Sequence, residues 1–180
     1  FRHGIFNRQT IAALTAAIPA GVFKVADSQV ASRWGNILDF RDFDLITPNE
    51  KEARFALGDQ DSVVRLLGSE LYRAARCKVL ILKLGARGVL TFRGEVEQPS
   101  DRAPFFAIDS FADTVRDAVG AGDALLAYAT LGLRATGNAV IASILGAAAA
   151  AVECECDGNI PVSLDALRAK LDALERLAGY

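Results

Sequence analysis

A chain of 180 residues has the length of one domain, and its 52% hydrophobic content is enough to bury a core. Its formal net charge of −2 gives no basic surface for nucleic acid, and no apolar run approaches the ~18 residues of a membrane span. We therefore expect a single domain over residues 1–180, with neither nucleic acid nor membrane as a partner.

The first third of the sequence begins with a helical pattern followed by two strand patterns. Apolar side chains recur at helical spacing over residues 8–19, which predicts a helix. The apolar runs 22–26 and 42–47 predict buried strands, and Pro48 stops the second of them.

The middle third alternates in the same way. Residues 49–57 predict a helix that ends at Gly58, and residues 62–76 predict another. The run 79–84 is almost entirely apolar, as in a strand that is covered on both faces. The apolar face expected on the second helix contains Leu66, Leu67, Leu71 and Ala74.

The last part contains a strand, a turn-rich stretch and three helices. We expect a strand over 89–92, short edge strands within 93–113, and helices over 121–135 and 138–153. A final helix is predicted to start at Ser163, a good N-cap. Its leucine stripe, expected to face the core, contains Leu164, Leu167, Leu171, Leu174 and Leu177. Strands alternating with helices predict an α/β fold with a parallel sheet.

The run Asp-Ala-Val-Gly-Ala-Gly-Asp at 117–123 predicts a loop that becomes a helix. Its glycines allow close approach of the backbone to a ligand, and the first N–H groups of a helix attract anions, phosphate above all. Asp123 is then placed to accept a proton from an attacking hydroxyl. The alternative is a glycine-rich turn in which Asp123 is simply the helix N-cap.

Two other places hold candidate binding residues. Asn49 and Glu52 are spaced i, i+3 just after a predicted strand, where open α/β sheets place ligands. The alternative there is a capping box, and the two interpretations can coexist. Lys83, Gly85 and Gly88 mark a junction between a strand and a turn, for which the alternative is a plain β-turn with positive φ.

The three cysteines, Cys77, Cys154 and Cys156, do not form a disulfide framework. The Cys-x-Cys spacing is too short for an ordinary metal pair, and the single histidine is far away in the sequence. We expect no zinc site, but reduced thiols in a cytoplasmic protein.

Three segments carry a family resemblance. Residues 45–52 read Leu-Ile-Thr-Pro-Asn-Glu-Lys-Glu, residues 83–88 read Lys-Leu-Gly-Ala-Arg-Gly, and the Gly-Ala-Gly-Asp run follows. In order and spacing they resemble the PfkB (ribokinase-like) carbohydrate kinase family, and the opening Phe1–Gly4 is similar to a turn of its heptose-phosphate kinase branch. The resemblance implies a ribokinase-like α/β fold, a mainly parallel sheet with helices on both faces, without the family's N-terminal part and lid.

The resemblance also implies roles for the candidate residues. Gly120, Ala121 and Gly122 match the anion hole, and Asp123 matches the catalytic base. The remaining matches are Asn49 and Glu52 for Mg²⁺ and phosphates through water, Lys83, Gly85 and Gly88 for the nucleotide, and Asp117 for a monovalent cation such as K⁺. Two departures are Ala118, where the family prefers threonine, and Asp27-Ser28-Gln29, which replaces the branch's Asp-Pro-Lys.

The expected function is ATP-dependent phosphorylation of a hydroxyl on a sugar or sugar phosphate. The alternatives are a nucleoside or vitamin kinase of the same superfamily, and a nucleotide-binding module without turnover of its own. The chain contains no methionine, and the resemblance covers only the later part of the family's fold. We therefore expect the C-terminal portion of a longer kinase, inactive toward sugars by itself, with an exposed sheet edge that favours homo-oligomers.

Overall fold

The structure is a computed structural model, and it describes residues 6–28, 36–94 and 103–179. The chain divides into two compact units: the first runs to Leu84 and resumes over Leu90–Ala107, and the second contains Gly85–Val89 and all residues from Ile108 onward. The opening Phe1–Gly4, which resembles a turn of the heptose-phosphate kinase branch, lies outside the described residues. The single domain over residues 1–180 stays a prediction.

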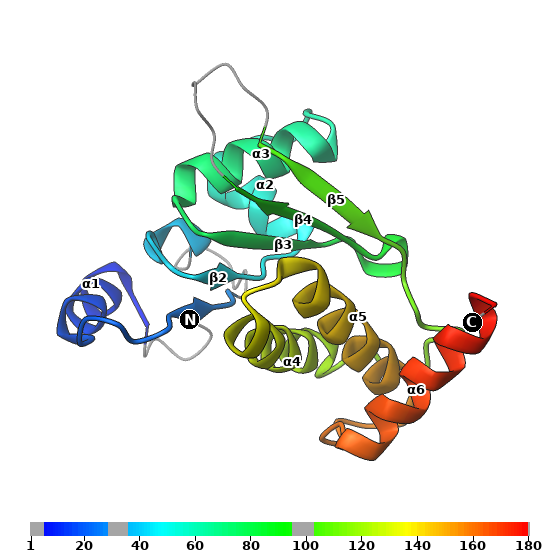
Figure 1. Ribbon diagram of the computed structural model, residues 1–180. Coiled ribbons are helices and arrows are strands. Elements are labelled where there is room, and N and C mark those ends of the chain that lie inside the picture. The colour runs from blue at the N-terminus through cyan, green and yellow to red at the C-terminus, as the bar shows by residue number, and fades with distance from the viewer. Residues whose placement is uncertain (1–5, 29–35, 95–102, 180) are drawn as a thin grey trace. The chain divides into compact units, whose positions relative to one another are not determined.

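A five-stranded sheet forms the centre of the first unit (Figure 1). Its strands follow one another in chain order: β1 is Val25–Ala26, β2 is Leu45–Ile46, β3 is Val79–Lys83, β4 is Val89–Arg93 and β5 is Phe105–Ile108. β2 lies parallel to β1 and β3. Only a short turn joins β3 to β4, which excludes a parallel crossover between those two strands.

The parallel strands are in register, so that their carboxyl ends share one edge of the sheet. Leu45 of β2 lies opposite Val25 of β1 and Val79 of β3. The predicted strand runs 22–26 and 42–47 are longer than β1 and β2, but Thr47 N–H still donates to Ala26 O at 3.1 Å. The residues that follow these strands therefore meet at the same edge, as the sequence argument for a ligand site requires.

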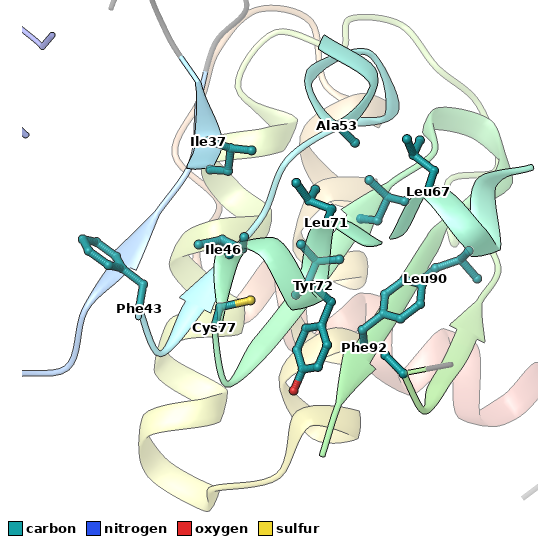
Figure 2. Close-up of a cluster of buried hydrophobic side chains, with 14 of the residues drawn as sticks. Ile37, Phe43, Ile46, Ala53, Leu67, Leu71, Tyr72, Cys77, Leu90 and Phe92 are labelled. Atoms are coloured by element: carbon teal, nitrogen blue, oxygen red, sulfur yellow. The ribbon is translucent and has the colours of Figure 1, made fainter. Parts of the chain in front are cut away.

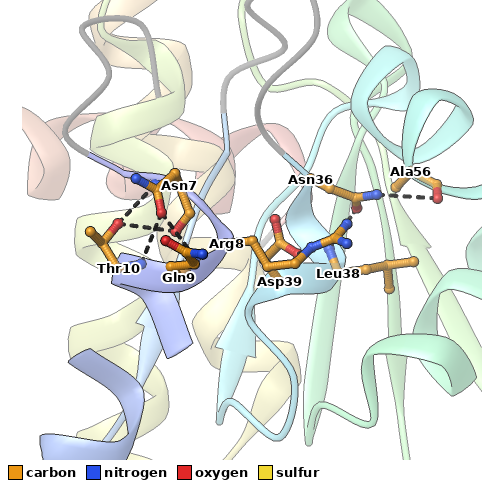
Figure 3. Close-up of polar contacts among 8 residues, drawn as sticks. All are labelled: Asn7, Arg8, Gln9, Thr10, Asn36, Leu38, Asp39 and Ala56. Atoms are coloured by element: carbon orange, nitrogen blue, oxygen red, sulfur yellow. Dashed lines mark hydrogen bonds and ion pairs between the residues drawn. The ribbon is translucent and has the colours of Figure 1, made fainter. Parts of the chain in front are cut away.

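The first helix, α1 (Arg8–Ala17), is held at its start by side chains. Figure 3 shows Asn7 accepting from the backbone of Thr10 at 3.0 Å, while the Thr10 hydroxyl accepts from Asn7 N–H at 2.8 Å. An ion pair of 3.2 Å joins Arg8 to Asp39 on a short 3₁₀ turn. The helix ends before the predicted residue 19 because Ile18 precedes a proline and adopts an extended conformation.

Two helices pack on the sheet of the first unit, α2 (Glu50–Leu57) and α3 (Val64–Ala75). The predicted face of α3 is confirmed at Leu67 and Leu71, which are fully buried, and was wrong at Leu66, which is exposed. The predicted Ala74 is only half-buried, and its neighbour Ala75 is the fully buried alanine. A side chain at Gly68 would overlap the ring of Phe92, so α3 lies directly against the sheet.

The core of this unit lies between α2, α3 and the strands (Figure 2). The Tyr72 and Phe92 rings stack with their centroids 6.4 Å apart. The Tyr72 hydroxyl donates to Lys78 O and Gly94 O, which satisfies the polar end of a buried aromatic side chain. Burial raises the pKa of Tyr72 to about 12.

The second unit is built on two long helices, α4 (Ala121–Thr136) and α5 (Ala139–Glu155), as predicted. Small residues bring their backbones together. A Cβ on Gly146 would lie 2.9 Å from Leu125 O, and one on Gly132 would lie 3.1 Å from Ala142 Cα. Leucines at these positions would force the helices apart.

The last helix, α6 (Leu164–Leu177), begins at the predicted N-cap, Ser163. Its leucine stripe faces the core only in its middle part: Leu167 is 4% exposed, whereas Leu164 and Leu177 are 60% and 80% exposed. The two ends of the predicted core stripe were therefore wrong, because the cluster with α5 residues Ala148 and Ala149 covers only the central turns. No helix in the described part of the chain is long and apolar enough to cross a membrane.

Candidate functional site

The candidate site residues form two sets, one in each unit. The strand-end set follows the parallel strands of the first unit and contains Asp27, Asn49, Glu52 and Lys83. The helix-start set lies in the second unit and contains Asp117 and the residues Gly120–Asp123. The Gly85–Gly88 turn belongs to the second unit and is described separately.

Asn49 and Glu52 form a capping box at the start of α2. Glu52 N–H donates to Asn49 Oδ1 at 2.9 Å, and Asn49 N–H donates to Glu52 Oε2 at 2.8 Å. The capping-box interpretation of this pair is thus confirmed. The Glu52 residue is only 4% exposed. Because each side chain holds the other, an amide and a carboxylate are fixed at the carboxyl edge of the sheet.

Lys83 lies beside the capping box at the end of β3. Its backbone pairs with Asn49 in a parallel bridge, and its N–H donates to Pro48 O at 2.9 Å. Its ammonium reaches Asp27 at the end of β1, with 2.6 Å between Nζ and Oδ2. One lysine therefore connects the ends of three parallel strands.

Asp27 is the member of the strand-end set that sequence reasoning missed. It stands immediately after β1, as Asn49 stands shortly after β2, so the argument that selected Asn49 applies to it as well. Its partner Lys83 is 56 positions away in the sequence, and a single sequence gives no local signal for such a pair.

The Gly85–Gly88 turn gives its two glycines different roles. Both have positive φ, 61° and 77°, and Gly88 N–H donates to Gly85 O at 2.9 Å, which confirms the tight-turn interpretation. A side chain at Gly88 would overlap the backbone of Ile108, whereas nothing lies within 4 Å of a Cβ placed on Gly85. Gly88 is needed for packing, and Gly85 for backbone conformation alone. The nucleotide contact of both residues stays a prediction.

The helix-start set has the loop-to-helix form that the sequence predicts. Gly120 is the N-cap of α4, with φ of 90° and no side-chain capping bond, and Asp123 lies in the first turn with an exposed side chain. Asp123 is therefore not the N-cap, and that alternative was wrong. The N–H groups of the first turn have no carbonyl of their own helix to bind, which makes this turn suited to an anion.

The loop before Gly120 is fastened to the end of α5. Arg116 N–H and Asp117 N–H donate to Cys154 O at 2.8 and 3.3 Å. Asp117 Oδ1 in turn accepts from Val119 N–H at 2.9 Å and so closes a small turn. Asp117 is half-buried, and its role in binding a monovalent cation stays a prediction.

Glu153 is a second residue that sequence reasoning missed. It is 2% exposed, and its Oε1 has no hydrogen-bond partner among the described residues. A Cβ on Gly120 would lie 2.6 Å from this Oε1 and 2.6 Å from Asn159 Oδ1. A buried carboxylate oxygen without a hydrogen-bond donor favours a cation. Its sequence signal is weak: an acidic residue in the last turn of an alanine-rich helix that ends at Glu155.

The three cysteines are free thiols. Burial raises the pKa of Cys77 to about 12. Burial and the neighbouring carboxylates Glu153, Glu155 and Asp117 also raise the pKa of Cys154 above its ordinary value. Neither is an activated nucleophile. Residues 6–28, 36–94 and 103–179 contain no cluster of three or more His, Cys, Asp or Glu side chains suited to a metal ion.

Comparisons with known proteins show what this chain is similar to. The family described as pfkB family carbohydrate kinase matches residues 6–166. The bifunctional protein HldE of Nitrobacter winogradskyi is 32% identical over 149 residues, which are 77% of this chain and 29% of that protein. The family resemblance is thus confirmed, and the HldE match agrees with the predicted branch.

Solved structures confirm the ribokinase-like fold. Phosphofructokinase-2 from Escherichia coli, in complex with substrates and products, superposes with a TM-score of 0.76 at 20% identity, over 96% of this chain and 54% of that one. Ribokinase from Thermotoga maritima gives 0.70 at 23% identity, over 93% and 60%. The chain therefore spans little more than half the length of these structures, and less than a third of HldE.

Proposed function

Because the chain belongs to the pfkB family of carbohydrate kinases, we propose that its protein transfers the γ-phosphoryl group of ATP to a hydroxyl of a sugar or sugar phosphate. One observation carries the proposal. An exposed carboxylate, Asp123, lies in the first turn of a 16-residue helix whose N-cap is a glycine with no side-chain cap. Such a turn offers backbone donors to a phosphoryl group and a base to the attacking hydroxyl.

Asp123 and the glycine turn have separate tasks in the proposed reaction. The Asp123 carboxylate accepts the proton of the acceptor hydroxyl as the oxygen attacks phosphorus. The N–H groups of Gly120, Ala121 and Gly122 stabilise the negative charge on the transferred group. Phosphoryl transfer needs little more from a protein than positioning and charge stabilisation.

The strand-end set supplies ligands suited to magnesium. Asn49 and Glu52 present hard oxygen atoms, which Mg²⁺ prefers, and Mg²⁺ usually retains several waters. When bound, the ion neutralises phosphate charge. The capping box keeps both side chains in one orientation, so that binding does not first have to order them.

A monovalent cation such as K⁺ fits the helix-start set. Glu153 Oε1, which has no partner among the described residues, and the Oδ1 of the exposed Asn159 both lie close to Gly120, and Asp117 belongs to the same loop. A cation bound by these oxygens offsets the Glu153 charge, which otherwise opposes an anion at the neighbouring N–H groups.

The test is a turnover assay on the full-length protein with a panel of sugars, sugar phosphates, nucleosides and vitamin alcohols. We expect ADP release that depends on a sugar or sugar phosphate and on Mg²⁺. Turnover with a nucleoside or vitamin would instead support the neighbouring kinase classes. Tight ATP binding without turnover on any acceptor would support a binding module.

The isolated 180-residue chain provides a second measurement. It spans about half of the matched structures, and we expect it to bind nucleotide weakly and to show no sugar-dependent turnover. Robust ADP release by this chain with a sugar would show that it contains a complete acceptor site.

A further inference from the structure

The Lys83–Asp27 pair is more enclosed than an ordinary surface ion pair. Its side chains are 17% and 20% exposed, with 2.6 Å between the charged atoms. The Arg76–Asp42 pair of the same unit has the same length but side chains that are 62% and 56% exposed. Enclosed charges have lost most of their water, so such a pair adds little net stability over apolar side chains of similar size.

Backbone hydrogen bonds hold both Asp27 and Lys83 in place. Asp27 Oδ1 accepts from Ser28 N–H at 2.9 Å, so that its Oδ2 is directed to the lysine. Lys83 is held by its backbone to the segment that starts α2. A lysine side chain normally samples many rotamers, and the bond to Asp27 restricts this one to a single region at the carboxyl edge of the sheet.

The Lys83 ammonium can donate hydrogen bonds to more than Asp27. It carries three N–H donors, of which Asp27 Oδ2 accepts one. It lies one strand away from the capping box that carries the Glu52 carboxylate. Without Lys83, Asp27 and Glu52 would leave this edge with two negative charges, which would repel a phosphate chain.

We propose that Asp27 is a positioning residue that holds the Lys83 ammonium ready to bind the phosphates of the nucleotide. The inference rests on the proposed function, and it adds a residue and a task to it. Lys83 donates to phosphate oxygens, and Asp27 acts only through Lys83. Pre-ordering the ammonium removes an entropy cost from nucleotide binding.

The test is a double-mutant cycle on the full-length protein, with dissociation constants for ADP and for adenosine measured by calorimetry. Lys83→Met is expected to weaken ADP binding by about tenfold or more, because it removes a charge-assisted hydrogen bond. The dissociation constant of adenosine should change by less than about twofold, because adenosine carries no phosphate. Asp27→Asn is expected to weaken ADP binding by a smaller factor, again without affecting adenosine.

The distinguishing result is the double variant. In the Lys83→Met background, Asp27→Asn is expected to have no further effect on ADP binding, because a residue that acts through Lys83 has nothing left to position. Asp27→Glu keeps a carboxylate, should retain most of the ADP affinity, and guards against a misfolded Asp27→Asn protein. Asp42→Asn, in the exposed Arg76–Asp42 pair, is the matched control and should leave the dissociation constants of both ADP and adenosine unchanged.

Three results would overturn the inference: additive effects in the double variant, equal weakening of ADP and adenosine, or an effect confined to sugar-phosphate binding. Normal ADP binding in every variant would also overturn it, while leaving the proposed function intact. Failure of the unsubstituted protein to bind ADP at all would overturn both.

Discussion

The strand-end set and the helix-start set achieve their arrangement in opposite ways. In the first, side chains hold one another: Asn49 with Glu52, and Lys83 with Asp27. In the second, the positioned groups are backbone N–H groups around Gly120, and the single reactive side chain, Asp123, is exposed. Substitutions in the first set should therefore disturb folding and function together, whereas Asp123 should affect function alone.

The largest effect is expected for Asp123→Asn. Loss of the base should lower kcat by roughly 10²–10⁴-fold with little change in the dissociation constant of ATP. Because the side chain is exposed, the free energy of unfolding should change by less than about 1 kcal/mol. Steady-state kinetics and thermal unfolding of the full-length variant measure both, and near-normal turnover would contradict the assignment.

Gly120→Ala should combine a loss of turnover with a loss of stability. The new Cβ would meet Glu153 Oε1 and Asn159 Oδ1 at 2.6 Å, and φ of 90° is unfavourable for alanine. We expect kcat to fall by about 10²-fold as the N–H groups move, with a destabilisation of about 1–3 kcal/mol.

The matched control is Gly158→Ala, where φ is 81° but nothing lies within 4 Å of the added Cβ. It should lose about 1 kcal/mol of stability through the backbone conformation and keep normal turnover. Equal kinetic effects at the two glycines would show that the contact with Glu153 and Asn159 does not matter.

In the strand-end set, Glu52→Gln separates capping from charge. Glutamine preserves the bond to Asn49 N–H, so the free energy of unfolding should change by less than about 0.5 kcal/mol. The Mg²⁺ concentration for half-maximal activity should rise several-fold, because a carboxylate ligand is gone. Glu52→Ala should show the same rise and lose about 1 kcal/mol of stability as well. An unchanged Mg²⁺ requirement in both variants would leave Glu52 with a capping role alone.

The smallest effect is a pH dependence of the first unit. Burial opposes the charge of Asp44, but the Lys24 N–H and the Lys78 ammonium overcome it and hold the pKa of Asp44 below its ordinary value of 3.8. A lowered folded-state pKa stabilises the fold above the unfolded value, and this contribution is lost as the pH falls through the folded value. Denaturant unfolding should show Asp44→Asn about 1 kcal/mol less stable at neutral pH, with the gap closing below pH 3.8. A gap that does not narrow as the pH falls below 3.8 would contradict the charge argument.

Local patterns in the sequence predicted most of the elements, and long-range contacts account for what they missed. The helix that ends at Gly58 and the break at Gly137 are set by left-handed caps, which the sequence displays directly. The exposure of Leu66 beside the buried Leu67 on α3 depends on which side the sheet lies, and that is not a local property. Only the fold pairs Asp27 with Lys83 and places Glu153 beside Gly120, and neither proximity is visible in a single sequence.

The glycine-to-backbone contacts of α4 and α5 have a mechanical consequence. Helices that touch through side chains can slide by exchanging rotamers, but at Gly132 and Gly146 there is no side chain to rearrange. The Gly120 turn begins one helix of this stiff pair, and Glu153 lies near the end of the other. If the Gly120 turn is displaced during a catalytic cycle, α4 and α5 should therefore move together as one rigid body, with the hinge outside the two helices.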